Sequence, residues 1–407
     1  MLRMFGAISA VALSAALAAA LAPLAGAQTI AGSKQADVGK ATIVHVDNYK
    51  APLTTWGAPD LQGLWTNATI TTLARPKEFG DRLVLTPEEV RKSEGEEAKA
   101  VADGQKASDP NLKTEDLPAS CGRGFTGANC GYNSFWIDPG SHAMNINGEY
   151  RTSFLVEPKN GQLPALTPEA QAAARGGAPR GGPGLARGDN PESMTLAERC
   201  LKDFGSSSGP PMMPLLYNNT YQIVQTPTDV VILTEMVHDA RIVHIVPGRD
   251  KDVHGRPSDI KQWMGDAVGW YEGDTLVVET TNFRPGQGFR GMPSSGKLVE
   301  RFRRVNDRQV EYTFEINEPK IFTAPIKAQI AMNATPGPLY EYACHEGNYA
   351  LPHILAGNRK ADRDAAEAAM KAAAKPVAAP AKGVKPVAKP TAAPAGAPKA
   401  EPAAIKN

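Results

Sequence analysis

The sequence has little net charge, few cysteines and few aromatic residues. The formal net charge is +1, there are 4 cysteines among 407 residues, and aromatic side chains make up 6% of the chain. A chain so close to neutral lacks the positive charge that general nucleic-acid binding requires. Beyond residue 27 no segment is apolar for long enough to span a bilayer as a helix. We therefore expect no nucleic-acid partner and no transmembrane segment in the mature chain.

Several catalytic and cofactor motifs are also missing. The sequence contains no Gly-x-Ser-x-Gly elbow, no phosphate-binding glycine loop leading into a helix and no dinucleotide fingerprint. It has neither Cys-x-x-Cys-His for covalent haem nor the zinc motif His-Glu-x-x-His. We expect no cofactor and no metal. A zinc site built from His238, His345 and a carboxylate is the alternative.

The first 27 residues have the plan of a secretory signal peptide. Arg3 is followed by an alanine-rich apolar run and then by small residues up to Ala27. We expect cleavage near Ala27 and a periplasmic or secreted protein. An uncleaved membrane anchor is the alternative. Residues 28–55 are polar and are expected to form an extended arm.

The far end of the chain has a different composition. Residues 359–407 are rich in Ala, Pro and Lys, so they are expected to be mostly disordered after a charged helix over residues 360–375. The lysines suggest weak contact with anionic lipid or cell-wall polymer. A solvated tail without function is the competing interpretation.

The region between these ends, residues 56–358, is expected to be one β-rich domain. Eight or nine strand-like runs lie between Tyr221 and Ala343. The clearest alternation puts one set of apolar residues on a single face: Val310, Tyr312, Phe314 and Ile316. These runs predict a mainly β fold, an antiparallel meander that closes into a barrel. A two-sheet β-sandwich is the alternative.

Two segments interrupt the β pattern. Thr86 precedes Pro87, and Glu89 follows three residues after the threonine, which predicts a capped helix running to about residue 102. The glycine-rich stretch within 171–192 predicts a flexible insert.

The triplet Gly63-Leu-Trp65 resembles the Gly-x-Trp that begins the first strand of lipocalin-like barrels. In such barrels the indole closes one end. A core tryptophan beside a turn glycine explains the same three residues.

Four cysteines in an exported chain allow three disulfide pairings. Cys121 and Cys130 enclose a short glycine-rich loop, where local pairing costs little chain entropy. This pairing leaves Cys200 for Cys344.

The first group of candidate catalytic residues is Glu235, His238, Asp239 and Arg241, where a strand runs into a bend. Alternation places Glu235 on the face of Val231 and Leu233. If that face lines the pocket, burial is expected to raise the pKa of Glu235 and suit it to proton transfer. His238 titrates near neutrality and needs a carboxylate such as Asp239 to orient it. A structural pair between Glu235 and Arg241 is the alternative.

A second group is His345 and Glu346, which a disulfide at Cys344 would hold in place. Tyr349 follows closely and is a candidate for ligand binding.

The third group is Trp263 and Asp266, which are expected to lie at the mouth of a pocket and bind ligand. Glu300 and Arg303 lie on opposite faces of one strand, so one of them is expected inside the barrel. An unpaired charge there would be costly, which favours a buried Glu–Arg pair between strands.

Together, these elements resemble a family of exported bacterial proteins, mostly of unassigned function. The resemblance rests on Glu235-Met-Val-His-Asp-Ala-Arg241, Gly269-Trp-Tyr-Glu-Gly-Asp274, Arg199-Cys200 and Tyr340-Glu-Tyr-Ala-Cys-His-Glu-Gly-Asn-Tyr349. The joint occurrence of the Cys200 and Cys344 elements in this family fits the second disulfide.

Three functions remain open from the sequence. The first is a barrel that binds or transforms a small, largely apolar molecule. The second is a hydrolase or lyase, without cofactor, using the candidate acidic, basic and histidine residues. The third is a non-catalytic envelope protein that contacts partners. A shared cavity for His238 and His345 would favour the enzyme.

Overall fold

The structure is a computed structural model that describes residues 46, 48–104, 113, 138–175, 188, 190–202, 209–248, 259–284, 289, 292–293 and 295–373. The expected signal peptide, most of the expected arm, and the tail from residue 374 onward lie outside these residues. Cys121 and Cys130, with their expected disulfide, also lie outside them.

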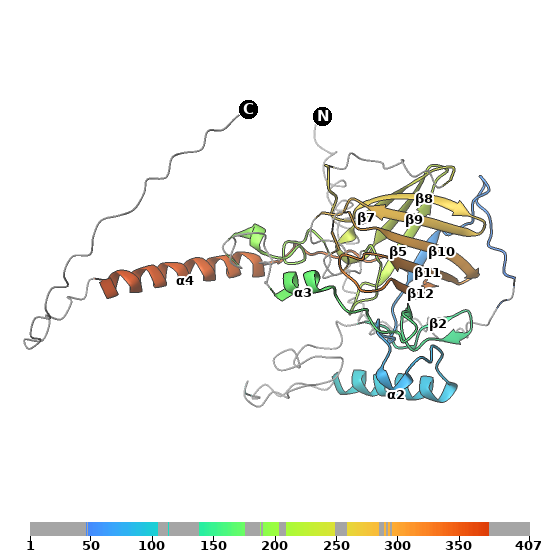
Figure 1. Cartoon of the computed structure of the whole chain (residues 1–407), viewed down its shortest axis with the longest axis horizontal. Coiled ribbons are helices and arrows are strands. Elements are labelled where there is room, and N and C mark those ends of the chain that lie inside the picture. Colours follow the sequence, from blue (N-terminus) through green and yellow to red (C-terminus); the bar gives the residue numbers. More distant parts are fainter. Residues whose placement is uncertain are drawn as a thin grey trace, which may run out of the picture.

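Helices and strands do not alternate regularly along the chain: short N-terminal elements precede a long run of strands (Figure 1). In chain order the elements are β1 (Gly63–Thr66), η1 (Lys77–Phe79), α2 (Pro87–Gly104), β2 (Asn145–Ile146), β3 (Glu149–Tyr150), β4 (Leu155–Glu157), α3 (Pro168–Arg175), η5 (Pro191–Ser193), β5 (Thr220–Gln225), β6 (Asp229–Thr234), η6 (Met236–His238), β7 (Ala240–Ile245), β8 (Asp266–Glu272), β9 (Thr275–Thr281), β10 (Leu298–Asn306), β11 (Gln309–Ile316), β12 (Ile326–Ala334) and α4 (Ala350–Ala373).

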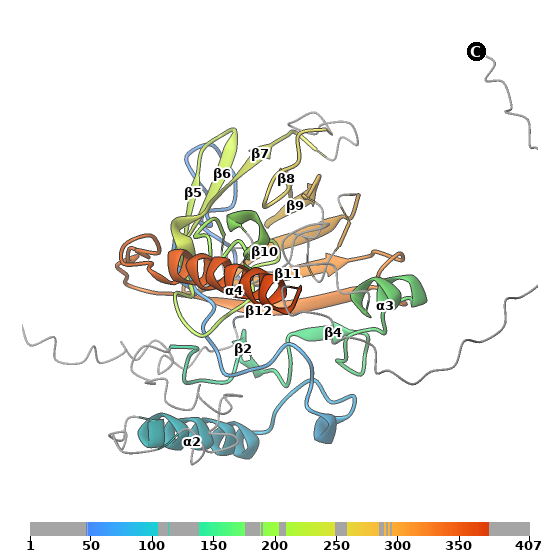
Figure 2. The ribbon, with the colours of Figure 1, turned by 90° about the vertical axis from the view of Figure 1, so that its left-hand side faces the viewer.

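The predicted barrel is confirmed. Strands β5 to β12 follow one another around the sheet, and β1 pairs with both β5 and β12, which closes a ring of nine strands. The part of β12 that β1 does not reach pairs with β4 at Lys327 and Ala328. On the side away from β11, β1 and β4 thus cover the two ends of β12, and β4 lies next to β12 in Figure 2. This pairing limits edge-to-edge association.

One neighbouring pair departs from the meander. β7 and β8 are parallel, with Val243 opposite Ala267 and Ile245 opposite Gly269. A parallel pair needs a connection that returns to the starting end of the sheet. Because they are parallel, β7 and β8 begin at the same end of the barrel, and residues 249–258 of the chain between them lie outside the described part of the structure.

The interior of the barrel is packed with side chains from alternating positions. Val310, Tyr312, Phe314 and Ile316 of β11 are all fully buried, as their alternation predicted. They pack in one apolar core with side chains of the other barrel strands, including Phe302. The rings of Phe302 and Tyr312 have centroids 4.9 Å apart.

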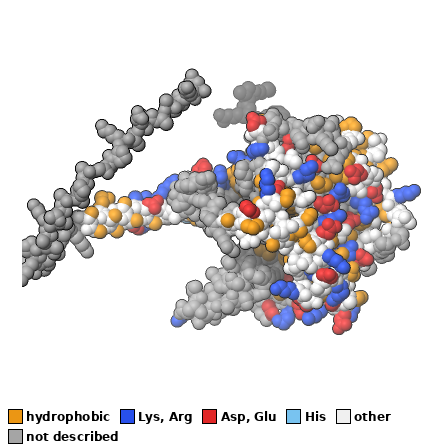
Figure 3. All heavy atoms as spheres, in the orientation of Figure 1, with side chains coloured by type: hydrophobic (Ala, Val, Ile, Leu, Met, Phe, Trp, Pro, Cys, Tyr) orange, Lys and Arg blue, Asp and Glu red, His pale blue; other side chains and the backbone are white. Residues whose placement is uncertain are grey.

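The outer face of β10 to β12 carries pairs of opposite charge. Arg301 and Lys327 each lie 3.1 Å from Glu315, and Arg303 lies 3.0 Å from Glu311. Acidic and basic side chains are interspersed over the face drawn in Figure 3. Solvent screens such exposed pairs, so they contribute little to stability individually.

Trp65 lies inside the barrel, as both interpretations of the Gly-x-Trp triplet predict. Its indole is 2% exposed, and its Nε1 donates to the carbonyl oxygen of Leu61 at 2.9 Å. The guanidinium of Arg304 lies 5.5 Å from the ring centroid. A buried indole therefore fills one part of the barrel and has its polar atom satisfied.

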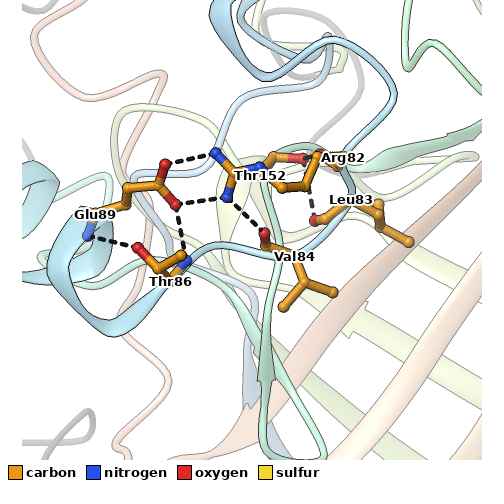
Figure 4. A network of polar contacts seen from close by, with 6 residues as sticks. All are labelled: Arg82, Leu83, Val84, Thr86, Glu89 and Thr152. Atoms are coloured by element: carbon orange, nitrogen blue, oxygen red, sulfur yellow. Dashed lines mark hydrogen bonds and ion pairs between the residues drawn. The ribbon is translucent and has the colours of Figure 1, made fainter.

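The predicted capped helix is α2. The backbone N–H of Glu89 donates to Oγ1 of Thr86 at 3.3 Å, and the N–H of Thr86 donates to Oε2 of Glu89 at 2.8 Å (Figure 4). Arg82 donates to both carboxylate oxygens of the same glutamate. This reciprocal capping satisfies N–H groups that the first turn leaves unpaired.

The C-terminal helix begins before its expected position. The helix expected from residue 360 is α4, which starts at Ala350 and so crosses the expected domain boundary at 358/359. In Figure 1 it extends away from the barrel, and Leu355 is its buried residue. Among the described residues, no helix is long and apolar enough to cross a membrane.

The expected flexible insert is partly ordered. Residues 171–175 belong to α3, and residues 191–192 belong to the short helix η5. Residues 176–187 and 189 lie outside the described part of the chain.

Candidate functional site

A buried ion pair crosses the interior of the barrel. Arg241 on β7 donates from Nη1 to Oε1 of Glu300 on β10 at 3.1 Å and from Nη2 to Oε2 at 2.6 Å. Their side chains are 2% and 0% exposed. Strands β8 and β9 separate β7 from β10 in the sheet, so the pair forms across the interior. Two parallel hydrogen bonds fix the relative orientation of the two planar groups.

Two hydroxyl groups complete this arrangement. Tyr312 on β11 donates its O–H to Oε1 of Glu300 at 2.7 Å. Oγ1 of Thr280 on β9 accepts from Nη2 of Arg241 at 3.4 Å and lies 3.5 Å from Oε2 of Glu300. We call these four residues, Arg241, Thr280, Glu300 and Tyr312, the barrel cluster. They come from four different strands.

The surroundings of the cluster determine the protonation of Arg241 and Tyr312. Burial acts to lower the pKa of Arg241, but the charge and hydrogen bonds of Glu300 outweigh it and hold the pKa above its ordinary value. Burial, followed by the charge of Glu300, holds the pKa of Tyr312 well above its ordinary value. Arg241 therefore stays charged, and Tyr312 keeps its proton and remains a donor to Glu300.

A short chain segment closes the barrel over this cluster. Residues Gly209–Met212 are all buried, and Met212 is fully buried. The backbone N–H of Met212 donates to the hydroxyl oxygen of Tyr312 at 3.0 Å. A Cβ built on Gly209 would lie 3.5 Å from Nη1 of Arg241, so the segment lies against the ion pair. We call Gly209–Met212 the barrel plug.

The plug is held from its other side by Asn67, which is 1% exposed. Its Nδ2 lies 3.4 Å from the carbonyl oxygen of Met212 and 3.2 Å from the hydroxyl oxygen of Tyr221. Within the described residues, Oδ1 of Asn67 and Nε of Arg241 have no hydrogen-bond partner. Buried polar atoms without a partner are uncommon and costly, and both lie beside the plug.

Glu235 is buried, but it does not continue the strand face of Val231 and Leu233, as alternation predicted. Strand β6 ends at Thr234, and Glu235 has helical dihedrals, φ −64° and ψ −39°. Its carboxylate accepts from the backbone N–H groups of Thr220 at 3.2 Å and Tyr340 at 3.3 Å. The predicted rise in its pKa is confirmed, with burial as the main cause. The predicted alternation is wrong, because the strand ends one residue too early.

The turn that follows Glu235 contains a strained residue. Val237 has φ 58° and ψ 17°, a left-handed conformation that is rare for a β-branched side chain. Such a residue costs on the order of 1–3 kcal/mol and persists because its surroundings determine it. His238 ends the η6 turn, and the carbonyl of Asp239 accepts from the N–H of Thr234 at 2.8 Å. The turn therefore sets the direction in which the chain enters β7.

The remaining candidates lie in separate places. His345, Glu346 and Tyr349 are exposed beyond the barrel strands, and Tyr349 is 71% exposed. Asp266 is buried at the start of β8. Trp263 stacks under the guanidinium of Arg284, which lies 4.0 Å from the ring centroid.

The structure thus distributes the six predicted catalytic residues. Arg241 is inside the barrel, Glu235, His238 and Asp239 lie around the β6–β7 turn, and His345 and Glu346 are on the surface. The alternative pair of Glu235 with Arg241 does not form, because Arg241 pairs with Glu300. The expected buried Glu–Arg pair between strands does form, with Glu300 as its inward member.

Four residues of this region were not predicted to belong to a site: Asn67, Met212, Thr280 and Tyr312. Alternation did place Tyr312 on the buried face of its strand. A hydroxyl on a face of Val and Phe was a signal that a polar partner lies inside.

The predicted disulfide between Cys200 and Cys344 is present, with 5.7 Å between the Cα atoms. It joins the segment before the plug to the segment after β12. Nδ2 of Asn348 lies 3.3 Å from Sγ of Cys200. In the described part of the chain, no group of three or more His, Cys, Asp and Glu residues is placed to hold a metal ion.

Comparison of this chain with protein-family models, with curated proteins and with solved structures finds no match.

Proposed function

We propose that this protein is exported and binds a small, largely apolar molecule at the end of the barrel that the plug now fills. The observation that carries the proposal is the plug itself. Met212, with its apolar side chain, is buried against a charged and hydroxyl-bearing cluster that belongs to the barrel wall. A ligand with an apolar body and a polar group would make the same contacts in its place.

The packing of the barrel restricts where such a ligand can sit. Large side chains fill the interior. They include Trp65, Tyr221, Phe302 and Phe314, each at most 2% exposed. A ligand therefore has to replace protein rather than enter an open lumen. The plug is the replaceable part, because it belongs to no strand of the ring.

The polar atoms beside the plug favour a binding role over a purely structural one. A buried ion pair is commonly no more stabilising than apolar residues of the same size. Nε of Arg241 and Oδ1 of Asn67 also lack protein partners within the described residues. A ligand that supplied these partners would recover free energy that the closed barrel forgoes.

Export is supported by the signal-like N-terminus and by the disulfide. A bridge between Cys200 and Cys344 is typical of an oxidising compartment such as the periplasm or the exterior.

The test measures binding of a neutral apolar fluorescent dye, N-phenyl-1-naphthylamine, to the full chain and to Met212→Ala. The dye has to displace Met212, whose buried side chain contributes about 2–5 kcal/mol relative to alanine. The variant should therefore bind the dye at least about tenfold more tightly than the parent, because about 1.4 kcal/mol corresponds to a factor of ten. Binding should saturate near one dye per chain.

The matched control is Val224→Ala, which truncates an apolar side chain that is 41% exposed on β5. It should bind the dye as the parent does. Far-UV circular dichroism of both variants distinguishes specific binding from binding to unfolded chains. Equal affinities in a folded Met212→Ala and Val224→Ala would refute a ligand site at the plug.

A further inference from the structure

The plug presents the N–H and the C=O of one residue, Met212, to the barrel, and a buried side chain contacts each of them. The N–H of Met212 donates to the hydroxyl oxygen of Tyr312 at 3.0 Å. The carbonyl oxygen of Met212 faces Nδ2 of Asn67 at 3.4 Å. A donor and an acceptor from one residue are thus each matched by a buried side chain of the barrel.

The direction of each hydrogen bond restricts what can replace the plug. The O–H of Tyr312 is committed to Glu300 at 2.7 Å, and its high pKa keeps it protonated. Its oxygen can therefore only accept from the group that occupies the plug position. Nδ2 of Asn67 is a donor and requires an acceptor. An occupant must offer an N–H toward Tyr312 and a C=O toward Asn67, as an N-acylated amino acid does.

The packing around Met212 indicates the shape of the apolar part. A Cβ on Gly209 would lie 2.8 Å from Cγ of Met212, so the space beside the first carbons of the side chain is tight. Methionine is unbranched and adapts its three torsions to such a space. A straight chain of similar length fits the position better than a branched or bulky one.

We propose that the barrel recognises N-acylated amino-acid amides, or short peptides, with an unbranched apolar side chain. This inference rests on the proposed ligand site at the plug and names the class of ligand. The plug is an internal copy of that ligand: it occupies the site through the same peptide contacts and has to leave before an external molecule binds.

The experiment uses the full chain carrying Met212→Gly, which removes the side chain of the plug, and the probe N-acetyl-L-methionine N-methylamide. The comparison probe is the ester analogue in which oxygen replaces the methionine N–H. The amide should raise the midpoint of thermal unfolding saturably and bind about tenfold more tightly than the ester. Loss of a hydrogen bond to a buried acceptor accounts for a preference of this size.

The role of the tyrosine is tested by Met212→Gly combined with Tyr312→Phe. This change removes the acceptor of the N–H, so the preference for the amide over the ester should disappear while the apolar contacts remain. The parent chain should bind neither probe at concentrations that saturate the variant, because the buried side chain of Met212 anchors its plug in the site, whereas the plug of Met212→Gly lacks this anchor and is displaced more readily. If Met212→Gly does not fold, Met212→Ala serves in its place.

The outcomes separate the two proposals. Equal binding of amide and ester would overturn the ligand class and leave the site itself intact. Binding of the naphthylamine dye without binding of either methionine probe would do the same. Failure of the dye and of both probes in a folded Met212 variant would remove the site altogether.

Discussion

Replacing Glu300 by glutamine tests whether the barrel cluster is a coupled buried network. Glu300→Gln preserves the size of the side chain and an acceptor for Tyr312, but it leaves the charge of Arg241 unpaired. Both side chains of the ion pair are almost fully buried, at 2% and 0% exposed. Removing one partner of such a pair typically costs about 3–5 kcal/mol, because the other charge stays buried. That is a large part of the ~5–15 kcal/mol by which domains are usually stable.

The assay is urea unfolding at 25 °C with the disulfide intact, followed by tryptophan fluorescence and circular dichroism. The matched control is Glu315→Gln, because Glu315 pairs with Arg301 on the outer face and is 37% exposed. Solvent screens that pair, so its loss should cost at most about 1 kcal/mol.

A double-mutant cycle with Arg241→Met isolates the interaction itself. The double variant removes both charges, so its destabilisation should be smaller than the sum of the two single changes, by about 1–3 kcal/mol. Two results would contradict the coupling that the geometry implies. One is additive losses of unfolding free energy in the cycle; the other is a loss for Glu300→Gln within about 1 kcal/mol of that for Glu315→Gln.

Three further changes have signs that follow from the structure. Burial raises the pKa of Glu235, so the folded chain binds this proton more tightly than the unfolded chain. The free energy of unfolding should therefore fall as pH rises from the ordinary glutamate pKa of 4.5 through the raised pKa, and Glu235→Gln should flatten this fall in urea titrations at increasing pH. Replacing Cys200 and Cys344 by serine opens a link across 144 residues and should lower the free energy of unfolding by about 2–5 kcal/mol, with a parent-like value contradicting the bridge. Thr86→Ala removes the cap of α2 and should cost about 0.5–2 kcal/mol, whereas Thr86→Ser should restore most of it in the same assay.

The sequence predicted the elements whose signals are local. Alternation of apolar residues depends only on the two-residue period of a strand, so the buried face of β11 could be predicted without a fold. The cap of α2 depends on residues three positions apart. The Cys200–Cys344 bridge followed from the number of cysteines once the short loop had been assigned its own pair.

The candidate site was less predictable, because residues near one another in sequence separate in space. Glu235 and Arg241 are six positions apart, yet one follows the end of β6 and the other points into the barrel. The prediction assumed that strand alternation continued through Glu235. The strained turn at Val237 interrupts it, and no period in the sequence marks where a strand stops.

By itself the sequence determined a mainly β chain whose strands alternate between buried and exposed side chains, with a charged residue inside; it favoured a barrel but left a two-sheet sandwich open, and the closure by β1 decided between them. Which charges meet was decided only by the tertiary structure. The pairing of Arg241 with Glu300 depends on how many strands separate them and on how the ring is staggered when β1 closes it. The tertiary structure also decided that Gly209–Met212 covers the cluster. This segment belongs to no strand of the ring, so its position depends on contacts with the closed barrel and not on a pattern in its own sequence.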